Sequence, residues 1–136
     1  MTMFAPYIST KEFEHNIDCF CPDTTHEMVM TINKGDIIEV LGERTFTMTN
    51  GWYFLVKVNN QEMFYMAIED LEYYVMKERL ISLLDLALKM NYSQFKINQS
   101  LEVGDKSLFM TSTNNLKELS NLKLKMEEYV SQVAVF

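Results

Sequence analysis

The spacing of apolar residues changes near residue 70 of this 136-residue chain. Before this point, apolar residues alternate with polar ones or form short β-branched and aromatic runs, which is typical of strands. After it they recur every three or four residues, a spacing that places them on one face of a helix. The pattern predicts an α+β protein with a strand-rich first part and a helical second part.

In the first part, turn signals separate the expected strands. Asn50-Gly51 and Asn59-Asn60 combine residues that tolerate a positive φ, which tight hairpin turns require, and residues 33–36 (Asn-Lys-Gly-Asp) are similar. Strands are expected over residues 28–32, 37–41, 52–58 and 62–66. A single helical turn over residues 67–71 and a short last strand over residues 73–75 complete this part.

In the second part, three helical segments are expected, beginning at Lys77. The first carries Leu80, Leu83, Leu84 and Leu88 on one face and ends at Asn91. Ser93 caps the second, which Gly104 ends, and Asp105 caps the third, which runs from about residue 106 to residue 133. Weak helix formers at residues 111–115 favour a bend or break there. We therefore expect a β domain over residues 1–75 and a helical module over residues 76–136.

The first part resembles a Src-homology-3-like small barrel. The resemblance is carried by "HEMVMTINKGDIIEVLGE" (residues 26–43), "NGWYFLVKV" (residues 50–58) and "AIEDLEYY" (residues 67–74), and above all by the Gly-Asp turn and the Trp after Gly. It implies a small antiparallel barrel whose first strand and following loop come from residues 13–25. The family's Gly-Tyr-Val-Pro and Ala-Leu-Tyr motifs are missing, so the resemblance implies the fold and not binding of proline-rich peptides.

The second part resembles the IDEAL family, a short helical module of Firmicutes proteins. One register matches residues 97–101 (Ile-Asn-Gln-Ser-Leu), followed by Gly104-Asp105, Phe109-Met110, Leu116 and Leu119. A rival register at residues 84–88 (Leu-Asp-Leu-Ala-Leu) keeps the Asp and the Ala of the signature. The resemblance implies an accessory or regulatory interaction module, with no enzymatic chemistry to transfer.

Composition narrows the class of partner. A formal net charge of −7 argues against binding a phosphate backbone, and a hydrophobic content of 48% is enough for a core. No apolar run approaches the length of a membrane span, and the first residues lack the features of a secretory signal. Cys19 and Cys21 are one residue apart, a spacing that rarely suits a disulfide, so we expect reduced thiols in a cytoplasmic protein.

One cluster has the chemistry of metal ligands, namely His15, Cys19, Cys21 and His26. Four such ligands could surround a tetrahedral zinc ion, but a one-residue gap between thiolates is unusual. The alternative is a pair of buried or half-buried thiols near two solvated histidines, and we expect no metal and no cofactor. Cys19 and His15 are four residues apart without a glycine-rich oxyanion loop, so we do not expect an enzyme.

The chain has more aromatic residues than a small barrel can bury. They form either the core and its junction with the helices or a binding surface. The candidate partner-binding residues are Trp52, Phe54, Tyr65, Tyr73, Phe109 and Phe136. The apolar tail over residues 133–136 either docks on the barrel or meets a second subunit, and we expect a homodimer that forms through the helices.

These observations favour a non-enzymatic, cytoplasmic protein that binds another protein. The resemblance to the IDEAL family implies that it belongs to a Firmicute or its phage and inhibits or modulates its partner. The alternative function is an acidic mimic of nucleic acid that blocks a DNA-binding protein. Mimicry requires carboxylates in rows, and six acidic residues could form one: Glu39, Glu43, Glu62, Glu69, Asp70 and Glu72.

Overall fold

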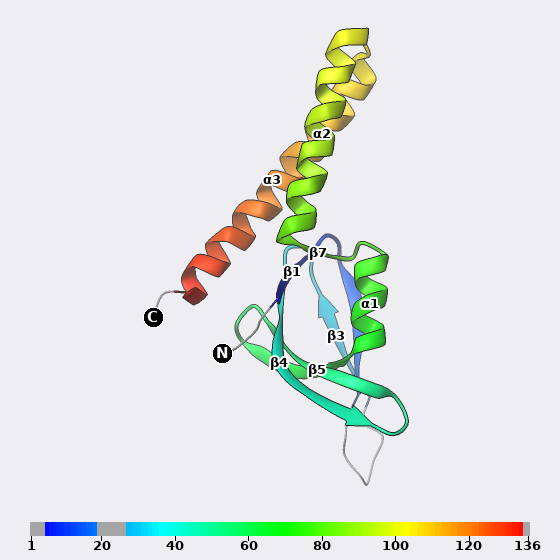
Figure 1. Cartoon of the computed structure of the whole chain (residues 1–136), viewed down its shortest axis with the longest axis vertical. Coiled ribbons are helices and arrows are strands. Elements are labelled where there is room, and N and C mark those ends of the chain that lie inside the picture. Colours follow the sequence, from blue (N-terminus) through cyan, green and yellow to red (C-terminus); the bar gives the residue numbers. More distant parts are fainter. Residues whose placement is uncertain (1–4, 19–26, 135–136) are drawn as a thin grey trace. The chain divides into compact units, whose positions relative to one another are not determined.

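The computed structural model describes residues 5–18 and 27–134 of the chain. In this part, seven strands and three helices follow one another along the chain (Figure 1). Their bounds are β1 Ala5–Ser9, β2 Phe13–Asp18, β3 Glu27–Ile32, β4 Ile37–Thr47, β5 Gly51–Val58, β6 Glu62–Ala67, α1 Ile68–Met76, β7 Leu80–Ser82, α2 Leu83–Val103 and α3 Lys106–Ala134. The prediction of an α+β fold is confirmed.

The chain divides into two compact units, Met1–Ile81 and Ser82–Phe136. We call them the strand unit and the helical unit and describe each by itself. The domain boundary expected from the sequence follows residue 75, before β7. Of the three helices in the described residues, α1 belongs to the strand unit, so the helical unit contains two long helices rather than the expected three.

The strand unit contains a five-stranded sheet with the order β6-β5-β4-β1-β7. The neighbours β1, β4, β5 and β6 pair antiparallel. Val40 of β4 pairs with Val56 of β5, and Arg44 pairs with Phe54, so β4 contains more residues than β5 between these two pairs. Extra residues of this kind bend a strand and increase its twist. The β4–β5 hairpin therefore changes direction at this point before it reaches its turn.

The turns lie where the sequence predicts them. Gly35 and Gly51 have φ values of 88° and 79°, and Asn59 and Asn60 have values of 51° and 60°. Glycine and asparagine are the residues that adopt this left-handed region at least cost. The four strands predicted around these turns are present, with β4 extending further than expected, to Thr47.

A second sheet consists of β2 and β3, which pair antiparallel from Phe13 with Ile32 to Asp18 with Glu27. The described strands thus form two sheets and not one closed barrel. The core of the strand unit draws on both sheets and on α1. Its buried members are Phe13, Ile32, Ile38, Val56, Val58, Met66, Leu71, Tyr74 and Leu80. The sequence pattern missed β1, whose Ile8 is fully buried.

Two predictions for residues 67–82 are wrong. Residues 73–75 are helical, because Leu71 and Tyr74 lie one turn apart on α1 and both bury their side chains in the core. This packing outweighs the strand preference of consecutive tyrosines. Residues 80–82 form the short edge strand β7 beside β1 rather than the first turns of a helix, and Leu80 and Ile81 are buried there.

The helical unit is an antiparallel pair of helices, α2 and α3, that pack on each other (Figure 1). Helix α2 continues through Asn91 and Ser93, where the sequence predicted a break and a new cap. A single asparagine in a helix costs well below 1 kcal/mol relative to alanine, which packing against α3 offsets. Helix α3 is likewise unbroken over residues 111–115.

The turn between the two helices was predicted correctly. Gly104 ends α2 in the left-handed conformation, with φ at 72°, and its N–H donates to the carbonyl of Ser100. Asp105 then caps α3, since its Oδ1 accepts a hydrogen bond of 3.0 Å from the N–H of Leu108. Helix α2 begins in the same way, because Ser82 accepts a bond from the N–H of Asp85.

Candidate functional site

The end of the β4–β5 hairpin carries an exposed aromatic pair. Phe46 and Trp52 are Cα partners across the hairpin, and their rings meet at 5.2 Å with an interplanar angle of 61°. They keep 55% and 45% of their surface exposed. The guanidinium carbon of Arg44, itself exposed, lies 5.0 Å from the centre of the Trp52 ring. We call Arg44, Phe46 and Trp52 the hairpin patch.

The local sequence explains why the hairpin patch is exposed. Trp52 and Phe54 are alternate residues of β5, and strand alternation gives them the same side of the strand as the core residues Val56 and Val58. The core ends before the hairpin does, so the described residues of the strand unit cover the end of this apolar row only in part. Phe54 is half-buried against the core, and Trp52, two residues further on, is exposed.

The remaining predicted binding residues lie elsewhere. Tyr73 on α1 is 42% exposed, and its ring lies under the guanidinium of Arg79 at 5.4 Å and near Lys77 at 5.9 Å. Tyr65 is half-buried, and its hydroxyl donates to Glu43 over 3.2 Å. Phe109 is a half-buried residue of α3 in the helical unit. Phe136, Cys19, Cys21 and His26 lie outside the described residues. Within the strand unit, Trp52 thus belongs to the hairpin patch, whereas Tyr65 and Tyr73 make these separate contacts.

A buried polar cluster around His15 of β2 was not predicted from the sequence. His15 is 2% exposed, because β2 directs His15 and Phe13 to the core, and it stacks on Phe64 with ring centres 5.6 Å apart. Nδ1 of His15 and the hydroxyl of Tyr74 share a hydrogen bond of 2.7 Å. With the hydroxyl as donor, the neutral ring carries its proton on Nε2. That nitrogen is buried without a hydrogen-bond partner among the described residues.

Burial and two carboxyl groups set the protonation of this cluster. Burial lowers the pKa of His15, while the nearby charges of Asp70 and then Asp18 oppose that shift. Burial also raises the pKa of Asp70, against the effect of His15. Asp18 accepts a hydrogen bond of 2.7 Å from Tyr53, whose pKa is raised to about 12, chiefly by burial and then by this bond. Burial thus favours the neutral form of His15, which is enclosed among the described residues.

The described residues contain no group of three His, Cys, Asp or Glu side chains arranged to hold a metal ion. His15, the described member of the predicted metal cluster, makes its hydrogen bond to Tyr74 instead. The predicted row of carboxylates is interrupted as well. Glu39 is 3% exposed and Asp70 is half-buried.

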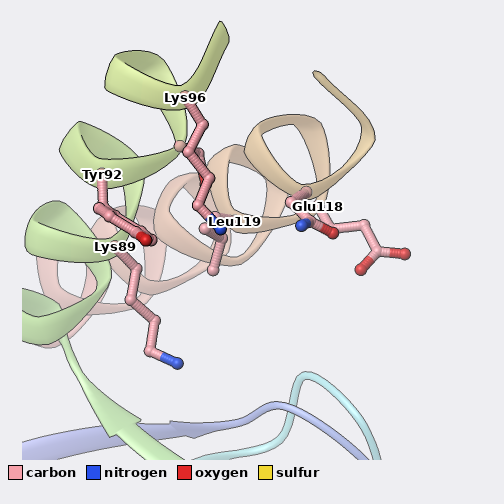
Figure 2. A pocket seen from close by; sticks show the side chains of 7 residues that line it. Lys89, Tyr92, Lys96, Glu118 and Leu119 are labelled. Carbon is pink, nitrogen blue, oxygen red and sulfur yellow. The ribbon is translucent and has the colours of Figure 1, made fainter. Parts of the chain in front are cut away.

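The helical unit has a small groove of about 270 Å³ between α2 and α3. Its lining residues are Lys89, Tyr92, Ser93, Lys96, Asn115, Glu118 and Leu119. Tyr92 and Lys96 of α2 are directed toward Leu119, whereas Lys89 extends away from them and Glu118 directs its carboxylate away from both lysines (Figure 2). The ammonium of Lys96 lies 4.6 Å from the centre of the Tyr92 ring. A second hollow of about 250 Å³ adjoins the turn at Gly104 and is lined in part by Phe109.

Among the helices of the described residues, none is both long enough and apolar enough to cross a membrane. Among the exposed side chains of the described residues are large aromatic and aliphatic ones, some with an adjacent cation, whereas His15 is buried. No family model, curated protein or solved structure matches the chain, so the geometry of its own residues has to support any functional assignment.

Proposed function

We propose that this is a non-enzymatic interaction protein that binds another protein through the hairpin patch. The observation that carries the proposal is the exposed Phe46–Trp52 pair with the Arg44 guanidinium over the indole. Trp and Arg are enriched among the residues that dominate binding energies at protein interfaces, as is Tyr. Burying one large apolar side chain is worth about 1.5–3 kcal/mol, so an exposed pair is a strong potential anchor.

The hairpin patch also indicates the chemistry of the partner. An apolar side chain of the partner would cover the exposed faces of Phe46 and Trp52. The guanidinium of Arg44 has five donors in a planar fork that suits a carboxylate, and its place over the indole orients that fork. We therefore expect a protein surface that presents an apolar residue next to Asp or Glu.

The resemblances to the Src-homology-3-like barrels and to the IDEAL module support this class of function. The two sheets and α1 share one core, which is compatible with a small barrel-like arrangement of the strand unit. An IDEAL-like helical unit would add a regulatory role. These resemblances are our reason to look for the partner among cytoplasmic proteins of a Firmicute or its phage, with inhibition or modulation as the outcome of binding.

We do not extend the proposal to a mimic of nucleic acid. Such a mimic needs its carboxylates exposed in rows that imitate the spacing of phosphates. Because Glu39 is buried and Asp70 is half-buried beside His15, the predicted row of six carboxylates is interrupted at two positions.

The test is capture by the full chain from a Firmicute lysate, with Trp52→Ala and Phe46→Ala beside the wild type. Met76→Ala is the matched control, since Met76 is an exposed apolar residue (70%) of the same unit outside the hairpin patch. Proteins retained by the wild type and the control but not by the patch variants are identified by mass spectrometry. The purified partner is then titrated by calorimetry.

We expect Trp52→Ala to weaken binding of the purified partner by at least tenfold, which corresponds to about 1.4 kcal/mol. Met76→Ala should bind as the wild type does. Circular dichroism verifies that each variant is folded. The proposal is wrong if the wild type retains nothing specific, or if all variants bind the partner equally.

A further inference from the structure

Helix α2 carries apolar side chains outside the face that packs on α3. One face, with the buried residues Ser93, Ile97 and Ser100, packs on α3. On the outward side Leu84, Leu88, Tyr92 and Phe95 follow one another in steps of four, four and three residues, the spacing of a single helical stripe. Tyr92 lies at the edge of this stripe, where it also lines the groove beside α3. Their exposed fractions are 70%, 56%, 60% and 61%. We call these four residues the outer stripe.

The outer stripe is an unusual feature for a helix surface. Helices at a surface normally have one apolar face, and a helix that is apolar on both faces is normally covered on both. With aromatic side chains of ~150–250 Å² each, these four residues expose roughly 500 Å² of mostly apolar surface, which is at the upper end for the largest patch of a monomer. Helix α3 differs, since between its exposed Met110 and Leu124 the exposed positions are polar.

We propose that the outer stripe is the interface of a homodimer, in which α2 packs antiparallel on α2 of a second copy. Two equal patches of this size bury roughly 1,000 Å² in total, at the lower limit of specific interfaces, so we expect a dimer of micromolar rather than nanomolar affinity. A two-fold axis makes such an interface self-complementary, because the same patch serves both partners.

The charges beside the outer stripe favour a second copy over an unrelated helix. Asp85 and Lys96 flank the stripe on the same edge of α2, about three helical turns apart. In an antiparallel pair of α2 helices, a two-fold axis perpendicular to the plane of the pair places this edge of one helix beside the same edge of the other. If the axis passes midway between Asp85 and Lys96, Asp85 of each copy lies beside Lys96 of the other. The same register places Leu84 beside Phe95 of the second copy and gathers Leu88 and Tyr92 at the centre. Two symmetric ion pairs thus border one apolar seam.

This inference concerns the helical unit and is independent of the proposed function of the hairpin patch. It is tested by sedimentation equilibrium of the full chain from low to several hundred micromolar. We expect the wild type to shift from monomer to dimer in this range and Leu88→Glu to remain a monomer with unchanged helical circular dichroism. The control is Leu124→Glu, which places the same charge at an equally exposed leucine (57%) of α3 and should dimerise as the wild type does.

Charge reversal tests the register. Asp85→Lys and Lys96→Glu should each weaken the dimer severalfold, because each places like charges together, and the double variant should recover it. A wild type that is monomeric throughout this concentration range would overturn the proposal. So would a dimer that survives Leu88→Glu. Failure of the double variant to recover would overturn the antiparallel register.

Discussion

Removing the hydroxyl of Tyr74 is a direct test of the buried polar cluster. In the variant Tyr74→Phe, the aromatic ring that packs on Phe13 at 4.6 Å is retained, and only the oxygen that is hydrogen-bonded to His15 is lost. Nδ1 of His15 would then have no partner, in a residue whose Nε2 already lacks one among the described residues. The perturbation therefore isolates one hydrogen bond in an otherwise unchanged core.

The expected cost follows from the burial of both partners. Tyr74 is 7% exposed and His15 is 2% exposed, so water cannot replace the lost bond without opening the core. A buried polar group left without a partner costs about 1–3 kcal/mol. For a unit of the size of Met1–Ile81, each kcal/mol lowers the melting temperature by about 4–8 °C. We expect Tyr74→Phe to lower the melting temperature of the strand unit by at least about 4 °C.

The assay is unfolding of the full chain by heat and, in parallel, by urea, each followed by the fluorescence of Trp52. This is the single tryptophan of the sequence and lies in β5, so its signal reports on the strand unit. The matched control is Tyr73→Phe, which removes the same atom from the adjacent residue, 42% exposed. Surface substitutions of this kind usually change stability by less than about 0.5 kcal/mol.

A double-mutant cycle completes the test. His15→Leu alone leaves the Tyr74 hydroxyl without a partner, whereas His15→Leu with Tyr74→Phe removes both polar groups at once. We expect the double variant to be more stable than the sum of the single effects predicts, with a coupling of about 0.5–3 kcal/mol. Equal stability of Tyr74→Phe and Tyr73→Phe, or strict additivity in the cycle, would show that the cluster does not stabilise the fold.

Four further predictions concern the protonation of the buried cluster and the turn between α2 and α3. Burial lowers the pKa of His15, so protonation of His15 favours the unfolded state. The stability of the strand unit should therefore fall as the pH drops below the ordinary histidine pKa of about 6.5. Urea titrations at several pH values should show this decline in the wild type and not in His15→Leu. At lower pH the raised pKa of Asp70 acts in the opposite direction, since its protonation favours the folded state, and Asp70→Asn should remove that gain. The Cβ that Gly104→Ala adds meets open space, but residue 104 is in the left-handed region, which is unfavourable for alanine. The substitution should lower the free energy of unfolding of the helical unit by about 1–2 kcal/mol, measured by circular dichroism. An unchanged melting curve would contradict the assigned helix end. Asp105→Ala should cost about 0.5–2 kcal/mol through loss of the cap to Leu108, with Asn114→Ala, at an exposed interior position of α3, as the control.

Local features of the fold were predictable because their causes are local. A positive φ at Gly35, Gly51 or Gly104 is a property of the residue itself. Strand alternation and helical spacing also operate over a few neighbouring residues, so the strands around the turns and the extent of α3 followed from the pattern. The exposure of Trp52 was among the possibilities that the sequence left open, since its density of aromatic residues did not show which ones the core would bury.

The errors arose where distant segments decide the outcome. Residues 73–75 have strand-forming side chains, yet they are helical because Tyr74 meets His15 and Phe13 from β2. Asn91 and Ser93 resemble a helix end, yet α2 continues because α3 packs along it. In each case a contact with another element outweighs a local preference of less than about 1 kcal/mol.

By itself the sequence determined an α+β protein with turns at the predicted glycines and asparagines and a helical second part, because short-range sterics and periodicity act along the chain. Only the tertiary structure decided that His15 would be a buried partner of Tyr74, that Glu39 would leave the surface, and that α2 would keep an apolar stripe exposed after pairing with α3. The burial of a residue depends on which distant segments pack against it. The free energy of those contacts cannot be read from the residues next to it in the sequence.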